Sequence, residues 1–156
     1  MKITDFLSKA SVANDLKAGS KVEVINEMIT LMVESGGIPK KDKLKVVEAL
    51  LAREALGSTA IGQGIAIPHA KSDAVSQLVA VLGVSKKGVN FDSLDGEPAY
   101  IFFLLIAPID SAGPHLKALA RVSRLLKDKF FRDSLKNTKT SKEIIDLVAQ
   151  EDARTG

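Results

Sequence analysis

The chain has 156 residues, of which 46% are hydrophobic and 26% are charged, values typical of one folded domain rather than a disordered or low-complexity chain. It contains no cysteine, which excludes disulfide bridges, thiolate zinc sites, iron–sulfur clusters and cysteine nucleophiles. The net charge of +3 is spread along the sequence, and one Tyr and no Trp are available to stack on bases, so we expect no nucleic-acid partner.

The beginning of the chain predicts two helices, each with one apolar face. Ser20 and Glu23 form a capping box, and Gly36 follows as a stop signal. Between them the apolar residues recur at helical spacing: Val22, Ile25, Met28, Ile29 and Met32. A second helix is predicted from about Asp42 to Gly57, with an inward face made of Leu44, Val47, Leu50 and Leu51.

The middle of the chain predicts two strands, 78–84 and 100–106. Both are nearly continuous apolar runs, as expected of strands that are covered on both faces. Between them, the dipeptides Lys87-Gly88 and Asp95-Gly96 predict turns. Before them, three glycines surround short apolar pieces, which end in Pro68 and His69.

Two further helices are predicted towards the end of the chain. Gly113-Pro114 opens one of them, with Pro114 at the first helical position. Its predicted inward stripe is Leu116, Leu119, Ser123 and Leu126. A second capping box, 140–143, starts the last helix, whose inward residues are Ile144, Ile145 and Val148. The residues after Asp152 show no pattern, so a frayed tail is predicted at 152–156.

Helices precede, interleave with and follow the strands. This order predicts an α/β fold in which a central mixed β-sheet is flanked by α-helices on both faces. We expect a single domain over residues 1–156, with a core from about residue 3 to residue 149. The longest apolar run, 99–107, is about half of what crosses a bilayer, and the first residues do not resemble a signal peptide. A cytoplasmic protein without membrane insertion is therefore expected.

Both histidines of the chain occupy unusual positions. His69 follows Pro68, which fixes its own φ, and the glycines before it allow a bound group to approach the backbone closely. His115 is predicted in the first turn of a helix, where free N–H groups attract anions. Lys71 adds a positive charge close to His69. A site that joined the two histidines would be suited to an anionic group.

Several other chemistries lack the residues that they need. In the glycine segment Gln63 stands where a P-loop requires lysine, and the spacing does not fit a dinucleotide fingerprint. A metal site built from His69, His115 and Asp110 would have no short-spaced ligand pair, so neither a metal nor another cofactor is expected. A hydrolase with His69 as general base has no partner nucleophile. An interaction module in which both histidines are structural stays open.

The segment 51–71, LAREALGSTAIGQGIAIPHAK, resembles the phosphohistidine segment of enzyme IIA domains of the bacterial phosphotransferase system. The likeness is to the fructose/mannitol and nitrogen-regulatory class, and it continues through FDSLDG at 91–96 and PHLKALAR at 114–121. It covers nearly the whole chain. Three positions depart from the common pattern of the class, namely Ala60, Gln63 and Ala70, and none of them removes a reacting group.

The resemblance implies a phosphotransferase component in which His69 accepts a phosphoryl group, His115 is the second histidine of the site and Arg53 is its arginine. We also expect Ser58, Thr59 and Gly64 to line the phosphate pocket, although turn capping is the more ordinary role of such hydroxyl groups. The implied donor is an HPr-like phosphocarrier protein. The segment favours a nitrogen-type regulatory protein, whose phosphorylation changes the binding of target proteins. The alternative is a sugar-specific component that passes phosphate to an enzyme IIB domain.

Overall fold

Two long antiparallel strands, β5 (Val79–Val89) and β6 (Ala99–Ala107), form the centre of a six-stranded sheet in this computed structural model, which describes residues 1–155. The strand order is β1-β5-β6-β3-β2, and β4 also pairs with β6. The short strands are β1 (Val12–Ala13), β2 (Ala60–Gly62), β3 (Ile65–Ala66) and β4 (His69–Lys71). Because β1 runs parallel to β5, and β3 and β4 run parallel to β6, the sheet is mixed, as predicted.

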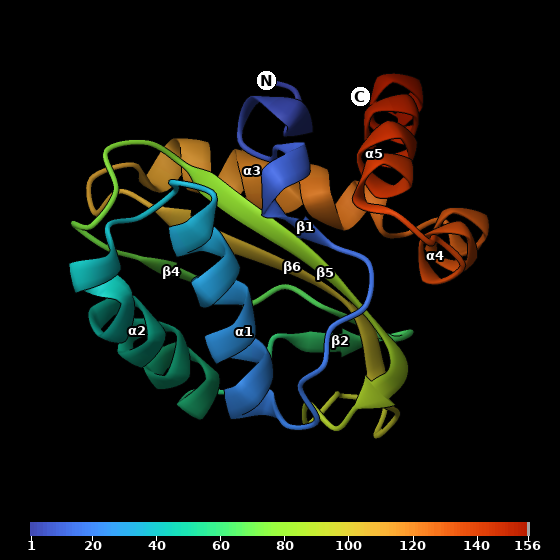
Figure 1. Ribbon diagram of the computed structural model, residues 1–156, viewed down its shortest axis with the longest axis horizontal. Coiled ribbons are helices and arrows are strands. Elements are labelled where there is room, and N and C mark those ends of the chain that lie inside the picture. Colours follow the sequence, from blue (N-terminus) through green and yellow to red (C-terminus); the bar gives the residue numbers. More distant parts are fainter. Residues whose placement is uncertain (156) are drawn as a thin grey trace.

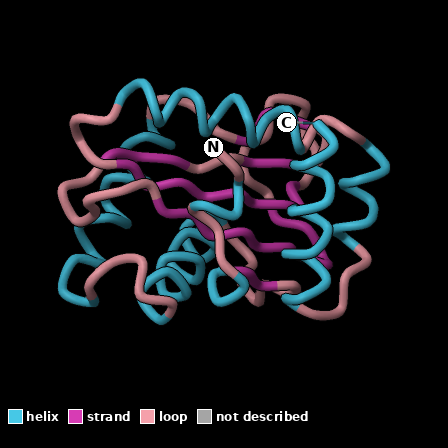
Figure 2. The backbone as a smooth tube through the Cα atoms, turned by 90° about the horizontal axis from the view of Figure 1, so that it is seen from above, coloured by secondary structure: helices cyan, strands magenta, loops and turns pink. Residues whose placement is uncertain are grey.

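Helices cover both faces of this sheet (Figures 1 and 2). One face carries α1 (Lys21–Glu34) and α2 (Lys43–Ala55), joined through the short 3₁₀ helix η3 (Lys40–Asp42). The other face carries α3 (Ala112–Leu125), α4 (Lys129–Lys136) and α5 (Ser141–Thr155). Two 3₁₀ helices at the start of the chain, η1 (Ile3–Asp5) and η2 (Lys9–Ser11), pack on that same side. The predicted single-domain α/β fold is therefore confirmed.

The alternation of side chains along β6 divides the core into two halves. Phe102, Leu104 and Ile106 pack under α1 and α2. Ile101, Phe103 and Leu105 pack under α3, α4 and α5. Because successive residues of a strand point to opposite faces, a continuous apolar strand serves both layers, which explains why β5 and β6 were visible in the sequence.

The boundaries of α1 agree with the signals in the sequence. The Ser20 hydroxyl accepts a hydrogen bond from the backbone N–H of Glu23 at 3.3 Å and donates to the Glu23 carboxylate at 2.8 Å. Gly36 takes a φ of +85° just after the helix, a conformation that glycine adopts without a steric penalty. The inward side of this helix is Val24, Ile25, Met28, Ile29 and Met32, whereas the predicted Val22 is exposed.

The predicted inward faces of two other helices were partly wrong. In α2 the buried residues are Val46, Val47, Leu50 and Glu54, and Leu44 is exposed. In α3 they are His115, Ala118, Val122 and Leu125, one position before the predicted stripe. Of that stripe, Leu126 is also buried and Leu119 packs against the core, but Leu116 is exposed. Helix α3 also begins two residues earlier than expected, at Ala112, so Pro114 is its third residue rather than its first. Pro114 is tolerated there because the first N–H groups of a helix have no intrahelical partner.

Two further expectations need correction, and one helix was missed. Lys87 and Gly88 lie inside β5, where Gly88 has a φ of +83° and the pairing with β6 shifts register between Val84 and Val89. Helix α4 was not predicted. The tail predicted to fray continues as helix α5 to Thr155, because Asp152 is buried and binds Arg121; Gly156 lies outside the described residues.

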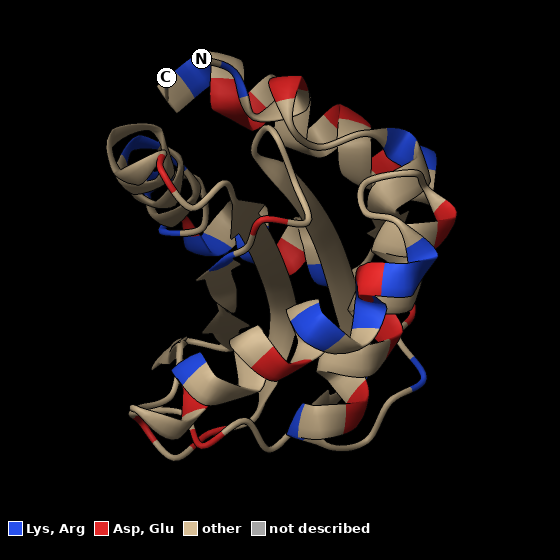
Figure 3. Cartoon of the chain, turned by 90° about the vertical axis from the view of Figure 1, so that its left-hand side faces the viewer, with Lys and Arg blue, Asp and Glu red and all other residues tan. Residues whose placement is uncertain are grey.

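Charged residues of both signs are interspersed along the helices. In the view of Figure 3, segments of Lys and Arg alternate with segments of Asp and Glu. This agrees with a net charge of +3 that is spread along the sequence rather than gathered in one run.

Candidate active site

His69 begins β4, the second of two short strand segments that run alongside β6 and are separated by a break. The segments β3 and β4 both pair with β6 in the parallel sense, and the register is the same on both sides of the break: Ile65 pairs with Ile101, and His69 with Leu105. Ile67 and Pro68 interrupt the strand without inserting a residue. Pro68 has no N–H to give to the ladder. The His69 side chain therefore belongs to the same face of the sheet as Leu105, which is the face that α3 covers.

The imidazole of His69 is held by a backbone carbonyl two residues before it. Its Nδ1 atom lies 2.7 Å from the carbonyl oxygen of Ile67. A carbonyl oxygen only accepts hydrogen bonds, so Nδ1 carries the proton of the neutral ring. The lone pair of the neutral ring is consequently on Nε2. This tautomer provides one defined nucleophilic nitrogen on a half-buried side chain.

The second histidine comes to the same place from the other layer. His115 is the fourth residue of α3 and is buried, and its ring centroid lies 5.6 Å from that of His69 with the ring planes inclined by 77°. Within residues 1–155, Nε2 of His115 is the one buried side-chain nitrogen or oxygen that has no hydrogen-bond partner. An unpaired buried polar atom costs free energy. An anionic group bound between the rings would satisfy it.

The surroundings of His115 favour the neutral form of its ring. Burial lowers the pKa of His115 below its ordinary value, and the nearby charges of His69 and Lys71 lower it further. Lys71 lies two residues after His69 in β4, so both side chains are on the same face of the strand. The site therefore combines two imidazoles with one exposed ammonium group.

Arg53 lies in the last turn of α2, which packs against β4. Its Nη1 donates to the carbonyl oxygen of Gly57 at 2.8 Å, so the guanidinium caps the end of the helix. A guanidinium has five N–H donors, and this bond uses one of them. The structure thus places Arg53 at the turn that leads towards His69, and its predicted contact with phosphate stays a prediction.

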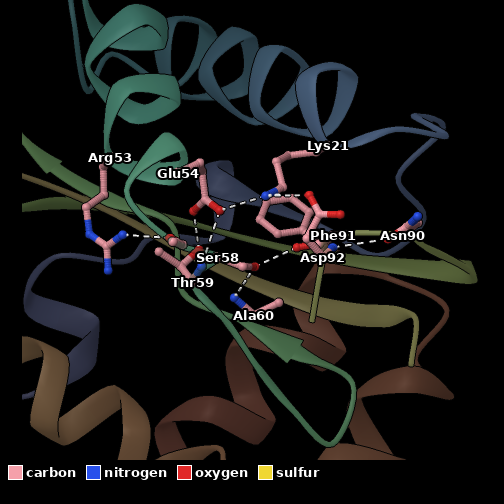
Figure 4. A network of polar contacts seen from close by, with 10 residues as sticks. Lys21, Arg53, Glu54, Ser58, Thr59, Ala60, Asn90, Phe91 and Asp92 are labelled. Carbon is pink, nitrogen blue, oxygen red and sulfur yellow. Dashed lines mark hydrogen bonds and ion pairs between the residues drawn. The ribbon is translucent and has the colours of Figure 1, made fainter. Parts of the chain in front are cut away.

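Ser58 and Thr59 follow in that turn, and both hydroxyl groups donate to protein acceptors (Figure 4). The Ser58 hydroxyl donates to the carbonyl of Phe91 at 2.6 Å, and the Thr59 hydroxyl donates to the carboxylate of Glu54. Thr59 is buried. In this arrangement the two hydroxyls fix the turn, which is the alternative that their residue types had suggested, and they are not free for a ligand.

Gly64 does not lie beside His69. It forms the tight turn between β2 and β3 with a φ of +78°, and its carbonyl accepts from the N–H of Tyr100 at 2.8 Å. His69 pairs with Leu105, which lies five residues beyond Tyr100 along β6. At the rise of a strand, five residues correspond to about 16 Å. The expectation that Gly64 lines the phosphate pocket is therefore not supported by its position. The glycine is needed for the turn.

Two charged residues near the site were missed by the sequence reasoning. Lys21 and Glu54 form an ion pair at 3.2 Å between the start of α1 and the end of α2 (Figure 4). A signal was present, because each residue stands at the end of its helix where the helix dipole disfavours its charge. No group of three or more His, Asp and Glu residues suited to a metal occurs within residues 1–155.

Comparison with known proteins places this chain in a family. The model of the family described as "Phosphoenolpyruvate-dependent sugar phosphotransferase system, EIIA 2" matches residues 5–151. The chain belongs to this EIIA family. The family predicted from the sequence is thereby confirmed, and with it the class of protein, a component of a phosphotransferase system. Within residues 1–155, no helix has both the length and the apolar character needed to cross a bilayer.

Relatives of two kinds resemble this chain. A fructose-specific EIIABC component of Bacillus subtilis is 40% identical over 97% of this chain, and the chain spans only 24% of that protein's length. A nitrogen regulatory protein of Bradyrhizobium diazoefficiens is 35% identical over 96% of this chain and 95% of its own length. The crystal structure of the nitrogen regulatory protein IIA-Ntr from Neisseria meningitidis has a TM-score of 0.85 and 31% identity, covering 94% of this chain and 98% of that one.

Proposed function

We propose that Nε2 of His69 accepts a phosphoryl group from the phosphohistidine of an HPr-like carrier protein. The observation that carries the proposal is the 2.7 Å contact between Nδ1 of His69 and the Ile67 carbonyl, which leaves the Nε2 lone pair as the nucleophile. Membership of the EIIA family supports it from outside the geometry. A cytoplasmic location is part of the proposal, because the resemblance to enzyme IIA domains implies it.

The transfer requires little covalent chemistry from the protein. The Nε2 lone pair of His69 forms a bond to phosphorus while the bond from phosphorus to the donor's ring nitrogen breaks, and that electron pair returns to the donor imidazole. The His69 ring then carries positive charge, so its Nδ1–H donates more strongly to the Ile67 carbonyl. What remains is to position the phosphoryl group and to stabilise charge on its three equatorial oxygens.

His115 and Arg53 are suited to that second task. The Nε2 atom of His115 is buried and unpaired, so a phosphoryl oxygen beside His69 gives it a partner. Its lowered pKa favours a neutral ring, which donates one hydrogen bond without adding a positive charge against His69. The spare donors of Arg53 provide a permanent positive charge. We assign the hydrogen bond to His115 and the charge to Arg53.

Phosphorylation by a carrier protein tests the assignment. The purified chain should take up one phosphate, and ³¹P and ¹⁵N spectra should place it on Nε2 of His69. His69→Gln should abolish the uptake. His115→Ala should leave the phosphate on His69 but slow its transfer by about 100-fold, the usual effect of losing one donor to a developing oxyanion. Full uptake by His69→Gln, or phosphate on Nδ1 or on His115, would refute the proposal.

We further propose a regulatory role of the nitrogen type, supported by the likeness to the Bradyrhizobium and Neisseria proteins. Nearly two negative charges added at His69 change the surface that a target protein reads. The 40% identity to a fructose-specific component favours the second candidate, transfer onward to an enzyme IIB domain. Donors and acceptors of both types, assayed side by side, distinguish the two roles. An interaction module without phosphorylation predicts no uptake from either donor.

A further inference from the structure

Lys21 and Glu54 occupy positions that their own helices disfavour. Lys21 is the first residue of α1, where the helix dipole is positive, and Glu54 is the last but one of α2, where it is negative. Their side chains are 18% and 3% exposed, so water screens this cost poorly. Neither helix gains stability from these charges in these places. The stability of α1 and α2 therefore does not explain this ion pair. Its role lies in the groups that the two side chains contact.

The Glu54 carboxylate holds Thr59 at two points. It accepts from the backbone N–H of Thr59 at 3.2 Å and from the Thr59 hydroxyl (Figure 4). Lys21 binds the same carboxylate at 3.2 Å and the carboxylate of Asp92 at 3.1 Å. Glu54 thus has three donors around a buried carboxylate, which leaves it no role as a base towards a ligand.

From Thr59 the hydrogen bonds continue to His69. The carbonyl of Thr59 accepts from the N–H of Ile67 at 3.1 Å, and the carbonyl of Ile67 lies 2.7 Å from Nδ1 of His69. The peptide that contains the Ile67 carbonyl ends at Pro68 and has no N–H of its own. Its direction consequently depends on how Ile67 is held, and Thr59 provides that contact.

We propose that Glu54, kept in place by Lys21, is a positioning residue that holds His69 in the tautomer with the proton on Nδ1. The pair fixes Thr59, Thr59 fixes Ile67, and the Ile67 carbonyl selects the tautomer. The consequence for phosphoryl transfer rests on the proposed function. The effect on the ring does not, because the tautomer exists without any donor protein.

Variants of Glu54 and Thr59, with a matched control, test this proposal. Glu54→Ala removes the carboxylate, and Glu54→Gln keeps an acceptor but loses the charge. Thr59→Val removes the hydroxyl, and Thr59→Ser restores it. The control is Asp152→Asn: Asp152 is also a buried carboxylate that accepts a backbone N–H, from Ile3 at 2.8 Å, and binds a cation, Arg121, at 2.6 Å.

The first measurement is the ¹⁵N spectrum of the His69 ring in the unphosphorylated protein. Glu54→Ala and Thr59→Val should shift population towards the tautomer with the proton on Nε2, Glu54→Gln should do so less, and Thr59→Ser should resemble the wild type. Asp152→Asn should lower the melting temperature without changing the ring. If Glu54→Ala does not fold, Thr59→Val, which keeps the Lys21–Glu54 pair, decides the question.

The second measurement is the rate of phosphorylation against donor concentration. In Glu54→Ala we expect kcat to fall by about 10- to 100-fold while KM for the donor stays within about twofold, because positioning acts on the reacting ring and not on docking. A wild-type tautomer and kcat in both folded Glu54 variants would overturn the proposal. If the variants shift the tautomer but the wild-type protein accepts no phosphate, the proposed function is refuted and the positioning role of Glu54 is retained.

Discussion

The imidazole rings of His69 and His115 lie 5.6 Å apart, centroid to centroid, with their planes inclined by 77°. One ring comes from a strand and the other from a helix in the layer that covers it. At this separation a charge on His69 disfavours a proton on His115. Under the proposed function the pair holds one shared negative group rather than two positive charges, and the protonation of His115 should depend on pH.

The stability of the protein should fall as pH drops below about 6.5. In the folded state the pKa of His115 is lowered from 6.5, whereas in the unfolded chain it takes its ordinary value. Between the two values the unfolded state binds the proton, so the free energy of unfolding decreases by at most about 1.4 kcal/mol per pH unit from this group. Above pH 6.5 this contribution is constant. Urea unfolding of the wild type and of His115→Gln, from about pH 5 to about pH 8, should give curves that differ in slope only on the acid side; parallel curves would contradict this.

Lys71 should accelerate the arrival of the phosphorylated donor. Its exposed ammonium group shares a face of β4 with His69 and lies close enough to His115 to lower its pKa. Lys71→Ala should slow phosphorylation by about 10-fold at low salt, and the gap should narrow as added salt screens the charge. Lys139→Ala, at an exposed position between α4 and α5, is the control. An unchanged rate at low salt would exclude this role.

Gly64→Ala should reduce stability and leave phosphorylation of the folded protein unchanged. Gly64 has a φ of +78°, and an added Cβ would lie 3.3 Å from the Tyr100 ring. The left-handed conformation alone costs a non-glycine residue about 1–2 kcal/mol. Gly36→Ala is a matched comparison, since its φ is +85° and an added Cβ would meet nothing within 4 Å, so its loss should be smaller. Thermal unfolding and transfer rates of both variants measure this, and a selective loss of rate in Gly64→Ala would restore Gly64 to the phosphate pocket.

Asp152→Ala should lower the free energy of unfolding by about 3 kcal/mol. The Asp152 carboxylate is buried and satisfies both the N–H of Ile3 and the guanidinium of Arg121, and its removal leaves these donors without a partner. Denaturant titration checks the value. Asp146→Ala, which removes an exposed i,i+4 pair with Lys142, should have little effect. Equal effects in the two variants would mean that burial at Asp152 carries no extra stabilisation.

Much of the fold was predictable because β5, β6 and the caps of α1 and α5 carry strong local signals. The inward faces of the helices were less predictable, because two of the buried residues are not apolar. In α3 the buried stripe begins at His115, which an apolar pattern does not count, so the predicted stripe began one position late. In α2 the inward position near the end is the charged Glu54. Strands β1 to β4 have two or three residues each and are defined by their pairing, which no local pattern contains.

The candidate site was also predictable only in part. The glycines, Pro68 and the two histidines predicted an anion site from their residue types and positions. The resemblance to enzyme IIA domains added Arg53. The joining of the two histidines depends on the start of α3, which brings His115 beside His69 of β4. The contact between Lys21 and Glu54 depends on α1 lying beside α2. Sequence reasoning had no access to these contacts between layers. It also assigned Gly64 to the pocket, since a flexible residue near an active histidine looks the same in sequence whether it binds a ligand or makes a turn.

The unchanged register on both sides of Pro68 constrains the length of this part of the chain. A single-residue insertion or deletion between Ala66 and His69 would reverse which residues face α3, and the imidazole would turn into the apolar space where Ala70 now packs under α1 and α2. Substitutions in this stretch are compatible with a working nucleophile, but gaps are not. Homologous sequences that transfer phosphate should therefore align here without indels, even where their residues differ.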